Sequence, residues 1–354
     1  MILHLFTQVS EYSLEFIRLL ADEFDPSEHL VVFRNRANAE KVNQTGIDVR
    51  FIESRQELIS QLPLLLEKSS KIIFHSFPVS RSLLFWYRHR KYMQKAAWFV
   101  WGHDAYWFRY CKKTLSNRLY EVIRAILIRK LETIISPISG DYEYVVNHYK
   151  TKAPLIKCRY PVPTDFELLK SLRNRSDNET VNIQLGNSAN PTNNLEELIQ
   201  FFGKYEKAAN FHFHCLLSYG DMKYAEKIID LGKSVLGNRF FPETRFMNRT
   251  EFANYISTID VLIMNHQRQQ GLGNIISFLY LGKKVYIRSD NSLYSLFKEN
   301  EITVYDTIEL LYSGDTKNLL EVDSDTISEN IIKTENFISH DRITLEWQQV
   351  FHVN

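Results

Sequence analysis

Short apolar runs alternate along the chain with longer stretches in which apolar residues recur every three or four positions. The runs have the length of buried β-strands, whereas the stretches between them, such as "RQELISQLPLLLEKS", have the period of amphipathic helices. This alternation predicts an α/β fold with a doubly wound parallel sheet. In the first half the predicted strands lie in "MILHLF", "HLVVFR", "DVRFI", "KIIFHSF", "AAWFVWG" and "TIISPI".

The alternation stops near residue 160 and then starts again. The sequence "RYPVPTDF" interrupts it, and the polar "KSLRNRSDNET" that follows has the composition of a linker. We therefore predict an N-terminal domain at 1–163, a linker at 164–180 and a C-terminal domain at 181–354, and we leave open whether the last helix returns to the first domain. In the second half the predicted strands lie in "VNIQLGNS", "FHFHCLLSYG", "NRFFP", "DVLIMNH" and "KKVYIR".

The composition is that of a globular protein and argues against several other classes of protein. Three widely spaced cysteines, Cys111, Cys158 and Cys215, form neither a disulfide framework nor a zinc spacing, which favours a reducing cytoplasm. The N-terminal "MILHLFTQVSEY" lacks the basic region and the apolar length of a signal peptide. Because no apolar run approaches about 18 residues, we expect no membrane-spanning helix.

The net charge of +1 conceals a strongly basic segment. Residues 81–130 contain twelve lysines and arginines but only two acidic residues, so the segment carries +10 and the rest of the chain about −9. We therefore expect an anionic partner. Nucleic acid is not expected, because the cations are spread over predicted helices and no nucleic-acid-binding module is recognisable.

Within this segment, "LSNRLYEVIRAILIRKLE" has the pattern of a basic amphipathic helix. Such a helix can rest on an anionic lipid surface. The alternative is a helix whose apolar face packs on the core and whose basic side is solvated. The apolar positions are Leu115, Leu119, Val122, Ile123, Ile126 and Leu127, and the cations around them are Arg118, Arg124, Arg129 and Lys130.

Three predicted strands end in turns that open helices. In tandem doubly wound domains the carboxyl ends of the strands point toward the cleft between the domains, so these turns are candidate binding sites. Glycine allows a tight turn, and polar donors at a helix N-terminus can bind an anion, with helix capping as the alternative. Tyr219 could also stack on a base or sugar. The first two turns contain Gly186, Asn187 and Ser188, and Ser218, Tyr219 and Gly220.

The third turn, "MNHQRQQGLGNIISFLYLG", carries the most information. Gly271 and Gly273 free backbone N–H groups where the helix through Asn274 begins, and Arg268 adds a guanidinium, a combination that suits a diphosphate. A dinucleotide-binding fingerprint does not fit, because its third glycine is missing and the turn comes late in the chain. The amides that can donate to phosphate or to sugar hydroxyls are those of Gln267, Gln269 and Gln270.

These turns, together with "FVWGHDAYWFRY", resemble a known family. It is that of the bacterial TDP-N-acetylfucosamine:lipid II N-acetylfucosaminyltransferases, the 4-alpha-L-fucosyltransferases of glycosyltransferase family 56. The resemblance runs nearly end to end, with weaker matches at "FHSF" around His75, "SGDYEYV", and "EWQQVF" with Trp347. The stronger patterns fall on Trp101, Gly102, Asp104 and Tyr106; on Gly186, Asn187 and Ser188; and on Arg268, Gln269, Gln270, Gly271 and Gly273.

The resemblance implies a GT-B glycosyltransferase with two Rossmann-like domains facing a cleft. It implies transfer of an N-acetylfucosamine-like deoxyaminosugar from a dTDP-sugar to an undecaprenyl-diphosphate-linked glycan, in the synthesis of enterobacterial common antigen or O-antigen. Such an enzyme would lie peripherally on the cytoplasmic face of the bacterial inner membrane, which favours the lipid interpretation of the basic helix. Near the donor site the sequence departs from the family pattern at Ser218-Tyr219-Gly220-Asp221 and Asn265-His266-Gln267, so the donor sugar is left open.

The candidates for the catalytic base are Asp104 and the adjacent His103. Asp104 follows a predicted strand, where aromatic neighbours would partly desolvate a carboxylate and raise its pKa. The alternative is that Asp104 caps a helix or pairs with Arg109. The candidates for acceptor binding are Trp101, Tyr106 and His75.

No metal or other cofactor is expected. GT-B enzymes usually stabilise the leaving diphosphate with helix N-termini and basic side chains. We interpret "DSD" at 323–325 as a helix cap, and His212 and His214 as structural, because further metal ligands are lacking. Two alternative functions are a GT-B-fold sugar-nucleotide epimerase and a catalytically silent protein that binds sugar nucleotide or glycan. The basic segment favours a lipid-borne acceptor over the epimerase.

Overall fold

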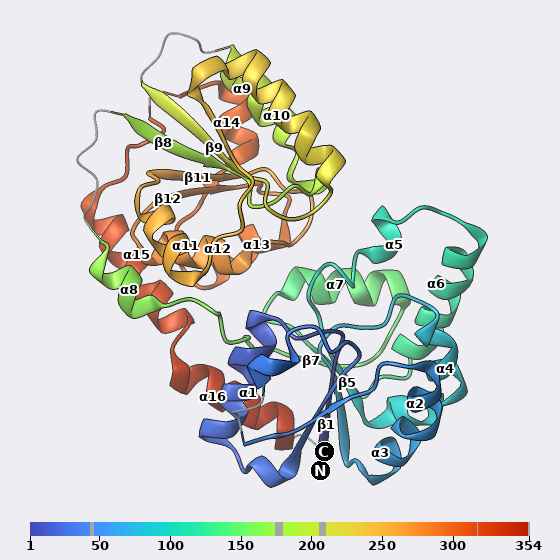
Figure 1. The fold of residues 1–354 in the computed structure, drawn as a ribbon. Coiled ribbons are helices and arrows are strands. Elements are labelled where there is room, and N and C mark those ends of the chain that lie inside the picture. Colours follow the sequence, from blue (N-terminus) through green and yellow to red (C-terminus); the bar gives the residue numbers. More distant parts are fainter. Residues whose placement is uncertain (43–45, 174–179, 205–209, 317, 353–354) are drawn as a thin grey trace. The chain divides into compact units, whose positions relative to one another are not determined.

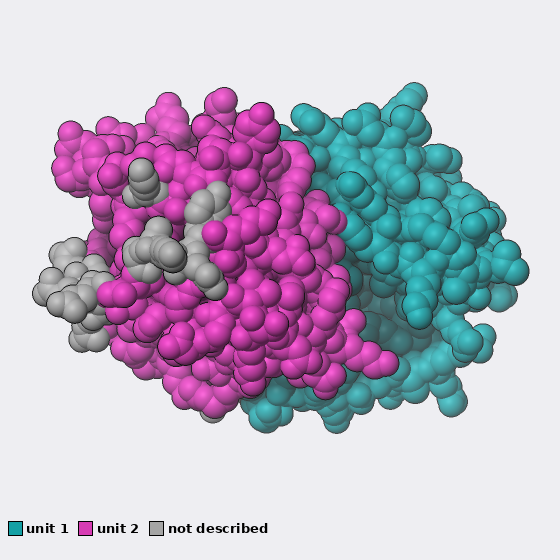
Figure 2. All heavy atoms as spheres, turned by 90° about the horizontal axis from the view of Figure 1, so that it is seen from above, with its two compact units in different colours: residues 1–163, 338–354 teal, residues 164–337 magenta. Residues whose placement is uncertain are grey.

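The computed structural model describes residues 1–42, 46–173, 180–204, 210–316 and 318–352. The chain forms two compact units, shown in different colours in Figure 2. Unit 1 comprises Met1–Pro163 and Ile338–Asn354, and unit 2 comprises Thr164–Phe337. Each unit contains one parallel sheet with helices around it, as the alternation of apolar runs predicted (Figure 1).

The sheet of unit 1 has seven strands in the order β3-β2-β1-β4-β5-β6-β7. The strands are β1 (Ile2–Phe6), β2 (His29–Phe33), β3 (Asp48–Phe51), β4 (Lys71–Phe74), β5 (Ala96–Phe99), β6 (Thr133–Ile135) and β7 (Leu155–Ile156). The α-helices are α1 (Glu11–Glu23), α2 (Arg55–Ser60), α3 (Leu62–Lys68), α4 (Ser82–Arg88), α5 (Trp107–Tyr110), α6 (Leu115–Ile128), α7 (Ser139–Tyr149) and α16 (His340–His352). Strand β7 was not predicted, because two residues are too short for a visible pattern.

Alternate residues of the strands in unit 1 pack on opposite faces of the sheet. Leu3 and Leu5 of β1 join a buried cluster with Trp98 and side chains of α2, α3, α4, α6 and α7. The neighbouring Phe6 joins a second cluster, with side chains of α1 and α16. Both faces are therefore buried, which is why the strands of unit 1 read as nearly continuous apolar runs.

Helix α16 brings the end of the chain back to unit 1. Trp347 is fully buried, packs on Phe16 with ring centroids 4.5 Å apart, and donates from Nε1 to the carbonyl of Arg159 at 2.9 Å. Glu346 accepts from the backbone N–H of Arg159 at 2.8 Å. These contacts join residues almost 190 positions apart, so α16 belongs to the core of unit 1.

The sheet of unit 2 has six strands in the order β10-β9-β8-β11-β12-β13. The strands are β8 (Val181–Leu185), β9 (Phe211–Leu216), β10 (Phe240–Glu243), β11 (Val261–Met264), β12 (Lys284–Ile287) and β13 (Tyr305–Asp306). The α-helices are α8 (Phe166–Ser171), α9 (Leu195–Gly203), α10 (Met222–Leu236), α11 (Arg249–Ser257), α12 (Leu272–Tyr280), α13 (Ser292–Glu299), α14 (Thr307–Ser313) and α15 (Ser324–Phe337).

Part of the stretch expected to be a linker is helical. Helix α8 buries Leu169 and packs beside α11 and α12, so residues 164–171 belong to unit 2. Asp165 caps this helix by accepting from the N–H of Leu168 at 2.9 Å. Residues 174–179 of the same stretch lie outside the described part of the chain.

Helix α6 corrects one expectation about the basic segment. Arg124, which the sequence placed among the solvated cations, is fully buried. Its guanidinium donates to the carbonyl of Pro78 at 2.5 Å and to that of Asp104 at 2.7 Å. Its Nε donates to the hydroxyl of Tyr149 at 3.3 Å. Burial is tolerated because partners 20 to 46 positions away satisfy these donors, and the helical pattern cannot show such partners.

Candidate functional site

The three turns singled out in the sequence meet at one edge of the sheet in unit 2. Gly186, Ser218 and Arg268 lie in the turns after β8, β9 and β11, which are neighbours in the order β9-β8-β11. Because all three strands run in the same direction, their carboxyl ends lie at the same edge. The fold therefore brings together segments about 80 residues apart in the sequence.

Two glycines allow the turns at this edge to pack closely together. Gly220 has φ of +120°, and a Cβ built there would lie 2.6 Å from the carbonyl oxygen of Ala189. Gly271 has φ of +70°, and its Cβ would lie 2.7 Å from the side chain of Met264 and 3.1 Å from that of Asn187. Any side chain at these positions would be strained and would push the turns apart.

Amide side chains connect the first and third turns. Gln270 Nε2 donates to Asn187 Oδ1 at 3.4 Å, and Gln270 Oε1 accepts from the hydroxyl of Thr192 at 2.8 Å. Asn187 Nδ2 donates to the hydroxyl of Tyr219 at 3.1 Å. The sequence suggests that Gln270 contacts phosphate or sugar. Instead it is buried and both ends of its amide are bonded within the protein, so it holds the third turn in place.

The third turn ends at the N-terminus of α12. Gly271 is the N-cap residue, and the first helical bond runs from the N–H of Ile275 to the carbonyl of Gly271 at 3.0 Å. The N–H groups of Leu272, Gly273 and Asn274 therefore have no partner within the helix, and they add to its positive end. Arg268, half-buried four residues before Leu272, donates from Nη1 to the carbonyl of Gln269 at 2.9 Å.

Several residues next to this turn were not among the predicted site residues. His266 is fully buried, and its Nδ1 faces Asn291 Nδ2 at 2.8 Å. Burial, followed by the charges of Arg268 and Arg288, lowers the pKa of His266 to about 3, so the ring is neutral. Arg288 donates to Asn265 Oδ1 at 3.2 Å. A signal for Arg288 was available, because it is the last residue of the predicted strand "KKVYIR".

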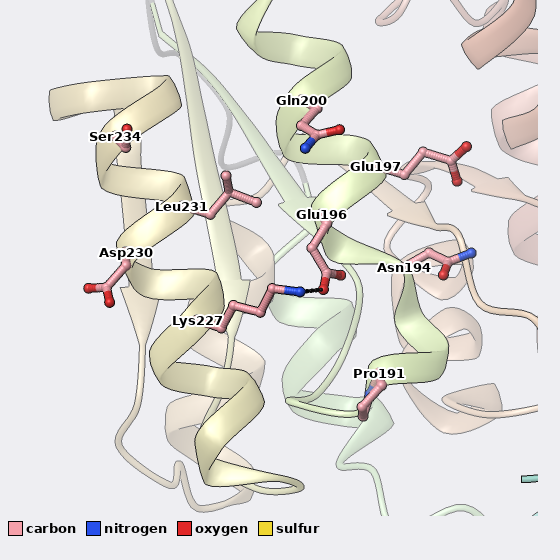
Figure 3. A pocket seen from close by; sticks show the side chains of 9 residues that line it. All are labelled: Pro191, Asn194, Glu196, Glu197, Gln200, Lys227, Asp230, Leu231 and Ser234. Carbon is pink, nitrogen blue, oxygen red and sulfur yellow. Dashed lines mark hydrogen bonds and ion pairs between the residues drawn. The ribbon is translucent and has the colours of Figure 1, made fainter.

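A groove elsewhere in unit 2 does not suit a diphosphate. Figure 3 shows it between α9 and α10. Its charged lining consists of Glu196, Glu197, Asp230 and Lys227, and the lysine is paired with Glu196 at 2.9 Å. The remaining acidic side chains would repel an anion.

In unit 1, Asp104 is buried with both carboxylate oxygens occupied. Only 1% of the residue is exposed. Its Oδ2 accepts from the N–H of Phe77 at 2.8 Å and from Trp98 Nε1 at 2.7 Å. Its Oδ1 accepts from the N–H groups of Trp101 and Ala105, both at 3.0 Å. Asp104 thus fixes the turn after β5 to the turn after β4.

The turn that contains Asp104 also contains the predicted site residues Trp101, His103 and Tyr106. His103 lies at its exposed tip. Tyr106 is buried and donates to Asp141 Oδ1 at 2.9 Å, so its hydroxyl is committed to the core. Trp101 is half-buried and packs on Tyr160 with ring centroids 4.6 Å apart.

His75 belongs to a buried row of histidines. Its Nε2 lies 3.0 Å from His4 Nδ1, and His4 Nε2 lies 3.0 Å from His29 Nδ1. At the other end, His75 Nδ1 lies 3.1 Å from the hydroxyl of Tyr160. Burial lowers the pKa of His4 and His75 well below the ordinary value and that of His29 to about 4, so the row is neutral. Both ring nitrogens of His75 are therefore engaged inside the core.

Two of the residues considered for a metal, Asp323 and His214, make hydrogen bonds within the protein. Asp323 accepts from the N–H of Thr326 at 2.7 Å and so caps α15. His214 Nε2 lies 3.1 Å from Asn182 Oδ1, and burial lowers the pKa of His214 to about 4. Among the described residues, no group of three or more His, Cys, Asp or Glu side chains could hold a metal ion.

Comparison with known families decides the kind of protein. The family described as 4-alpha-L-fucosyltransferase, glycosyl transferase group 56, matches residues 12–338. The chain belongs to this family. It is therefore a glycosyltransferase, and the resemblance seen in the sequence is confirmed. No curated protein sequence matches the chain.

Solved glycosyltransferases share the fold of this enzyme at low sequence identity. HepE of Anabaena in complex with UDP and glucose has a TM-score of 0.72 at 11% identity, over 99% of each chain. A glycosyltransferase from Rickettsia africae has a TM-score of 0.69 at 11% identity, over 99% of this chain and 97% of its own. WaaG, a glycosyltransferase involved in lipopolysaccharide biosynthesis, has a TM-score of 0.63 at 10% identity, over 100% of both chains. The predicted GT-B fold is thus confirmed.

The geometry of unit 2 gives this glycosyltransferase a candidate donor site. Glycosyl transfer requires stabilisation of the nucleoside diphosphate that leaves, and the α12 N-terminus with Arg268 offers N–H donors and a positive charge. No helix in the described ranges is long and apolar enough to cross a membrane.

Proposed function

We propose that this glycosyltransferase transfers an N-acetylfucosamine-like deoxyaminosugar from a dTDP-sugar to an undecaprenyl-diphosphate-linked glycan. The reaction would take place on the cytoplasmic face of the bacterial inner membrane, in the synthesis of enterobacterial common antigen or O-antigen. The observation that carries the proposal is the match of a 4-alpha-L-fucosyltransferase family to residues 12–338, which include the turn at the α12 N-terminus.

Three features of unit 2 support a nucleoside diphosphate as the leaving group. The first turn of α12 presents backbone N–H groups, Arg268 supplies a guanidinium four residues before Leu272, and Gly271 lets the first and third turns pack closely at this helix N-terminus. The relative HepE has been solved with UDP-glucose, a nucleotide sugar. A diphosphate bound at this edge would meet donors that need no reorganisation.

The absence of an acidic residue in this part of the sequence supports thymidine as the nucleoside. No aspartate or glutamate occurs between Arg268 and Asp290 to accept from a ribose hydroxyl. A deoxyribose nucleotide lacks the 2′-hydroxyl and does not require that acceptor. We therefore propose dTDP, rather than UDP, as the nucleotide of the donor.

The proposed reaction needs no metal ion. Helix N–H groups and Arg268 would stabilise the negative charge that develops on the diphosphate. Activity is accordingly expected to survive EDTA. Loss of activity on chelation, with recovery on addition of Mg²⁺ or Mn²⁺, would contradict this part of the proposal.

For the base we propose His103, with Asp104 in a positioning role. The carboxylate of Asp104 accepts four hydrogen bonds and is 1% exposed, so an acceptor hydroxyl cannot reach it. Two of those bonds hold the backbone on either side of His103, whose ring is exposed at the carboxyl end of β5. Histidine is the side chain that most often acts as a general base at neutral pH.

The decisive experiment is transfer by the purified protein. Membranes that carry undecaprenyl-diphosphate-linked oligosaccharide would be incubated with radiolabelled dTDP-N-acetylfucosamine-type sugars, with the matching UDP-sugars as controls. We expect the label to enter the lipid fraction only from a dTDP-sugar and only with acceptor present. Epimerisation of the donor without acceptor, or donor binding without transfer to any acceptor, would instead support one of the two alternative functions.

A further inference from the structure

The exposed surface of residues 81–130 in unit 1 carries positive charge only. The two acidic residues of this segment, Asp104 and Glu121, are both buried. Of its twelve basic residues, Arg124 is buried and Lys95 is half-buried. The ten that remain exposed are Arg81, Arg88, Arg90, Lys91, Arg109, Lys112, Lys113, Arg118, Arg129 and Lys130.

Helix α6 exposes an apolar stripe among these cations. Leu115 is 86% exposed, Leu119 55% and Val122 58%. Their spacing of four and three residues places them on one face of the helix. On another face Ile123 and Leu127 are buried in the core of unit 1. The apolar residues of α6 thus divide into a set that fills the core and a set that lies on the surface.

Helix α4 extends the apolar surface. It packs beside α6 (Figure 1). Leu84 and Tyr87 on this helix are 52% and 40% exposed. Isolated exposed apolar residues are normal on a protein surface, but a group of them within a region of one charge marks an interaction site.

We propose that the surface formed by these five apolar residues and the ten cations docks on a membrane rich in anionic lipid. The ammonium and guanidinium groups would lie among the lipid headgroups, while the leucines and the valine enter the boundary of the acyl chains. The proposal rests on the proposed function for its purpose, since an undecaprenyl-linked acceptor must be reached at a membrane. The exposed side chains and their charges are independent of that function.

The positive charge of this surface favours an anionic membrane over a second copy of the chain as its partner. A two-fold interface places the same patch of both subunits face to face. On this surface the cations of one copy would then lie against the same cations of the other, with no exposed acidic residue of the segment to compensate. An anionic lipid surface supplies the complementary charge.

Vesicle binding by three variants tests the proposal. The apolar variant carries Leu115→Ser, Leu119→Ser and Val122→Ser, and the charge variant carries Lys112→Gln, Lys113→Gln and Arg118→Gln. A matched control carries Ile59→Ser and Leu64→Ser, because these residues of α2 and α3 are 56% and 64% exposed but lie outside the basic segment. Binding would be measured by co-sedimentation with vesicles of phosphatidylglycerol and phosphatidylcholine, and with phosphatidylcholine alone.

We expect the wild type to bind the anionic vesicles and to be released as salt rises. The charge variant should lose about fivefold in affinity for each cation removed. The apolar variant should lose about tenfold or more even at low salt, and the control should bind like the wild type. Affinity for dTDP should stay the same in all three variants, because none of the changes lies in unit 2.

Several results would overturn the proposal. These are equal binding of the wild type to both kinds of vesicle, full binding by the apolar variant, and self-association of the wild type that the apolar variant abolishes. If the apolar variant does not fold, the charge variant and the lipid dependence of the wild type decide. Transfer from a dTDP-sugar to detergent-solubilised undecaprenyl-diphosphate-linked glycan separates the two proposals, since its absence despite vesicle binding contradicts the proposed function and leaves the docking surface standing.

Discussion

Arg268 and Arg288 follow adjacent strands, but their charges have different surroundings. Arg288 is paired with Asp290 at 2.8 Å, which raises its pKa and offsets its charge. Arg268 lies in the turn that leads into α12, four residues before Leu272, and donates from Nη1 to the carbonyl of Gln269 at 2.9 Å. At the residue scale, Arg268 is therefore the cation most suited to a diphosphate.

Replacement of Arg268 by alanine should weaken dTDP binding by about 1.5–3 kcal/mol, the usual contribution of hydrogen bonds to charged groups. Isothermal titration calorimetry would measure the loss. Arg245→Ala is the control, because Arg245 also lies in unit 2 but is exposed and paired with Glu251 at 2.7 Å. Equal dTDP affinity of a folded Arg268→Ala protein and the wild type would remove the donor site from this turn.

Replacement of Asp104 should mainly reduce stability, whereas replacement of His103 should mainly reduce activity. In Asp104→Asn an amide nitrogen would face N–H donors that now bond the carboxylate, so stability should fall by about 2–4 kcal/mol. His103→Gln should leave the melting temperature unchanged and lower kcat by roughly 10²–10⁴, with dTDP affinity retained.

Melting curves and single-turnover rates on the same preparations would compare these two variants. The reverse pattern, with a stable but inactive Asp104→Asn enzyme and an active His103→Gln enzyme, would restore Asp104 as the base. The sequence singled out this turn. It could not show that four N–H groups converge on Asp104, because two of them come from Phe77 and from the indole of Trp98.

At the scale of elements, the start of α12 depends on a close fit between the first and third turns. Gly271→Val would place a branched side chain against Met264 and Asn187 at a φ of +70°. We expect the helix N-terminus to shift and dTDP affinity to fall about tenfold or more.

Gly237→Ala provides a matched control for that change. Gly237 also has a positive φ, +61°, but a Cβ there would meet nothing within 4 Å. It should cost about 1–3 kcal/mol of stability from backbone strain and leave dTDP affinity unchanged. If both variants bind dTDP like the wild type, the fit between the turns has no part in donor binding.

At the scale of the whole molecule, the histidine row makes unit 1 sensitive to acid. His4, His29 and His75 are buried beneath α1 and α16, where Phe351 packs on His4 and His29, and Trp347 packs on His75. Their pKa values in the folded protein are lowered from the ordinary value of about 6.5. Unfolding therefore takes up protons below pH 6.5, so stability is fully present above that pH and decreases as the pH falls toward 4.

Urea unfolding at about pH 7.5 and pH 5 would measure this effect. Tryptophan fluorescence reports unit 1 alone, because all five tryptophans lie in it. Each histidine can lower the free energy of unfolding by up to about 1.4 kcal/mol per pH unit, so we expect a loss of roughly 3–6 kcal/mol between these conditions. As a control, the variant in which the exposed His340 is replaced by glutamine should lose the same free energy of unfolding as the wild type. A free energy of unfolding that is equal at both pH values would contradict the neutral row.

The two parallel sheets, the turns at their carboxyl edges and the family could be predicted from the amino-acid sequence. These features rest on local patterns, namely the period of apolar residues and glycine beside polar groups. Other features became visible only in the folded chain. Arg124 is buried, and Gln270 and Asp104 are committed to internal hydrogen bonds. Arg288 lies beside the third turn, and three histidines form one row. The physical reason is that a polar side chain is buried or exposed according to the partners it finds. Those partners come from strands and turns far away in the sequence.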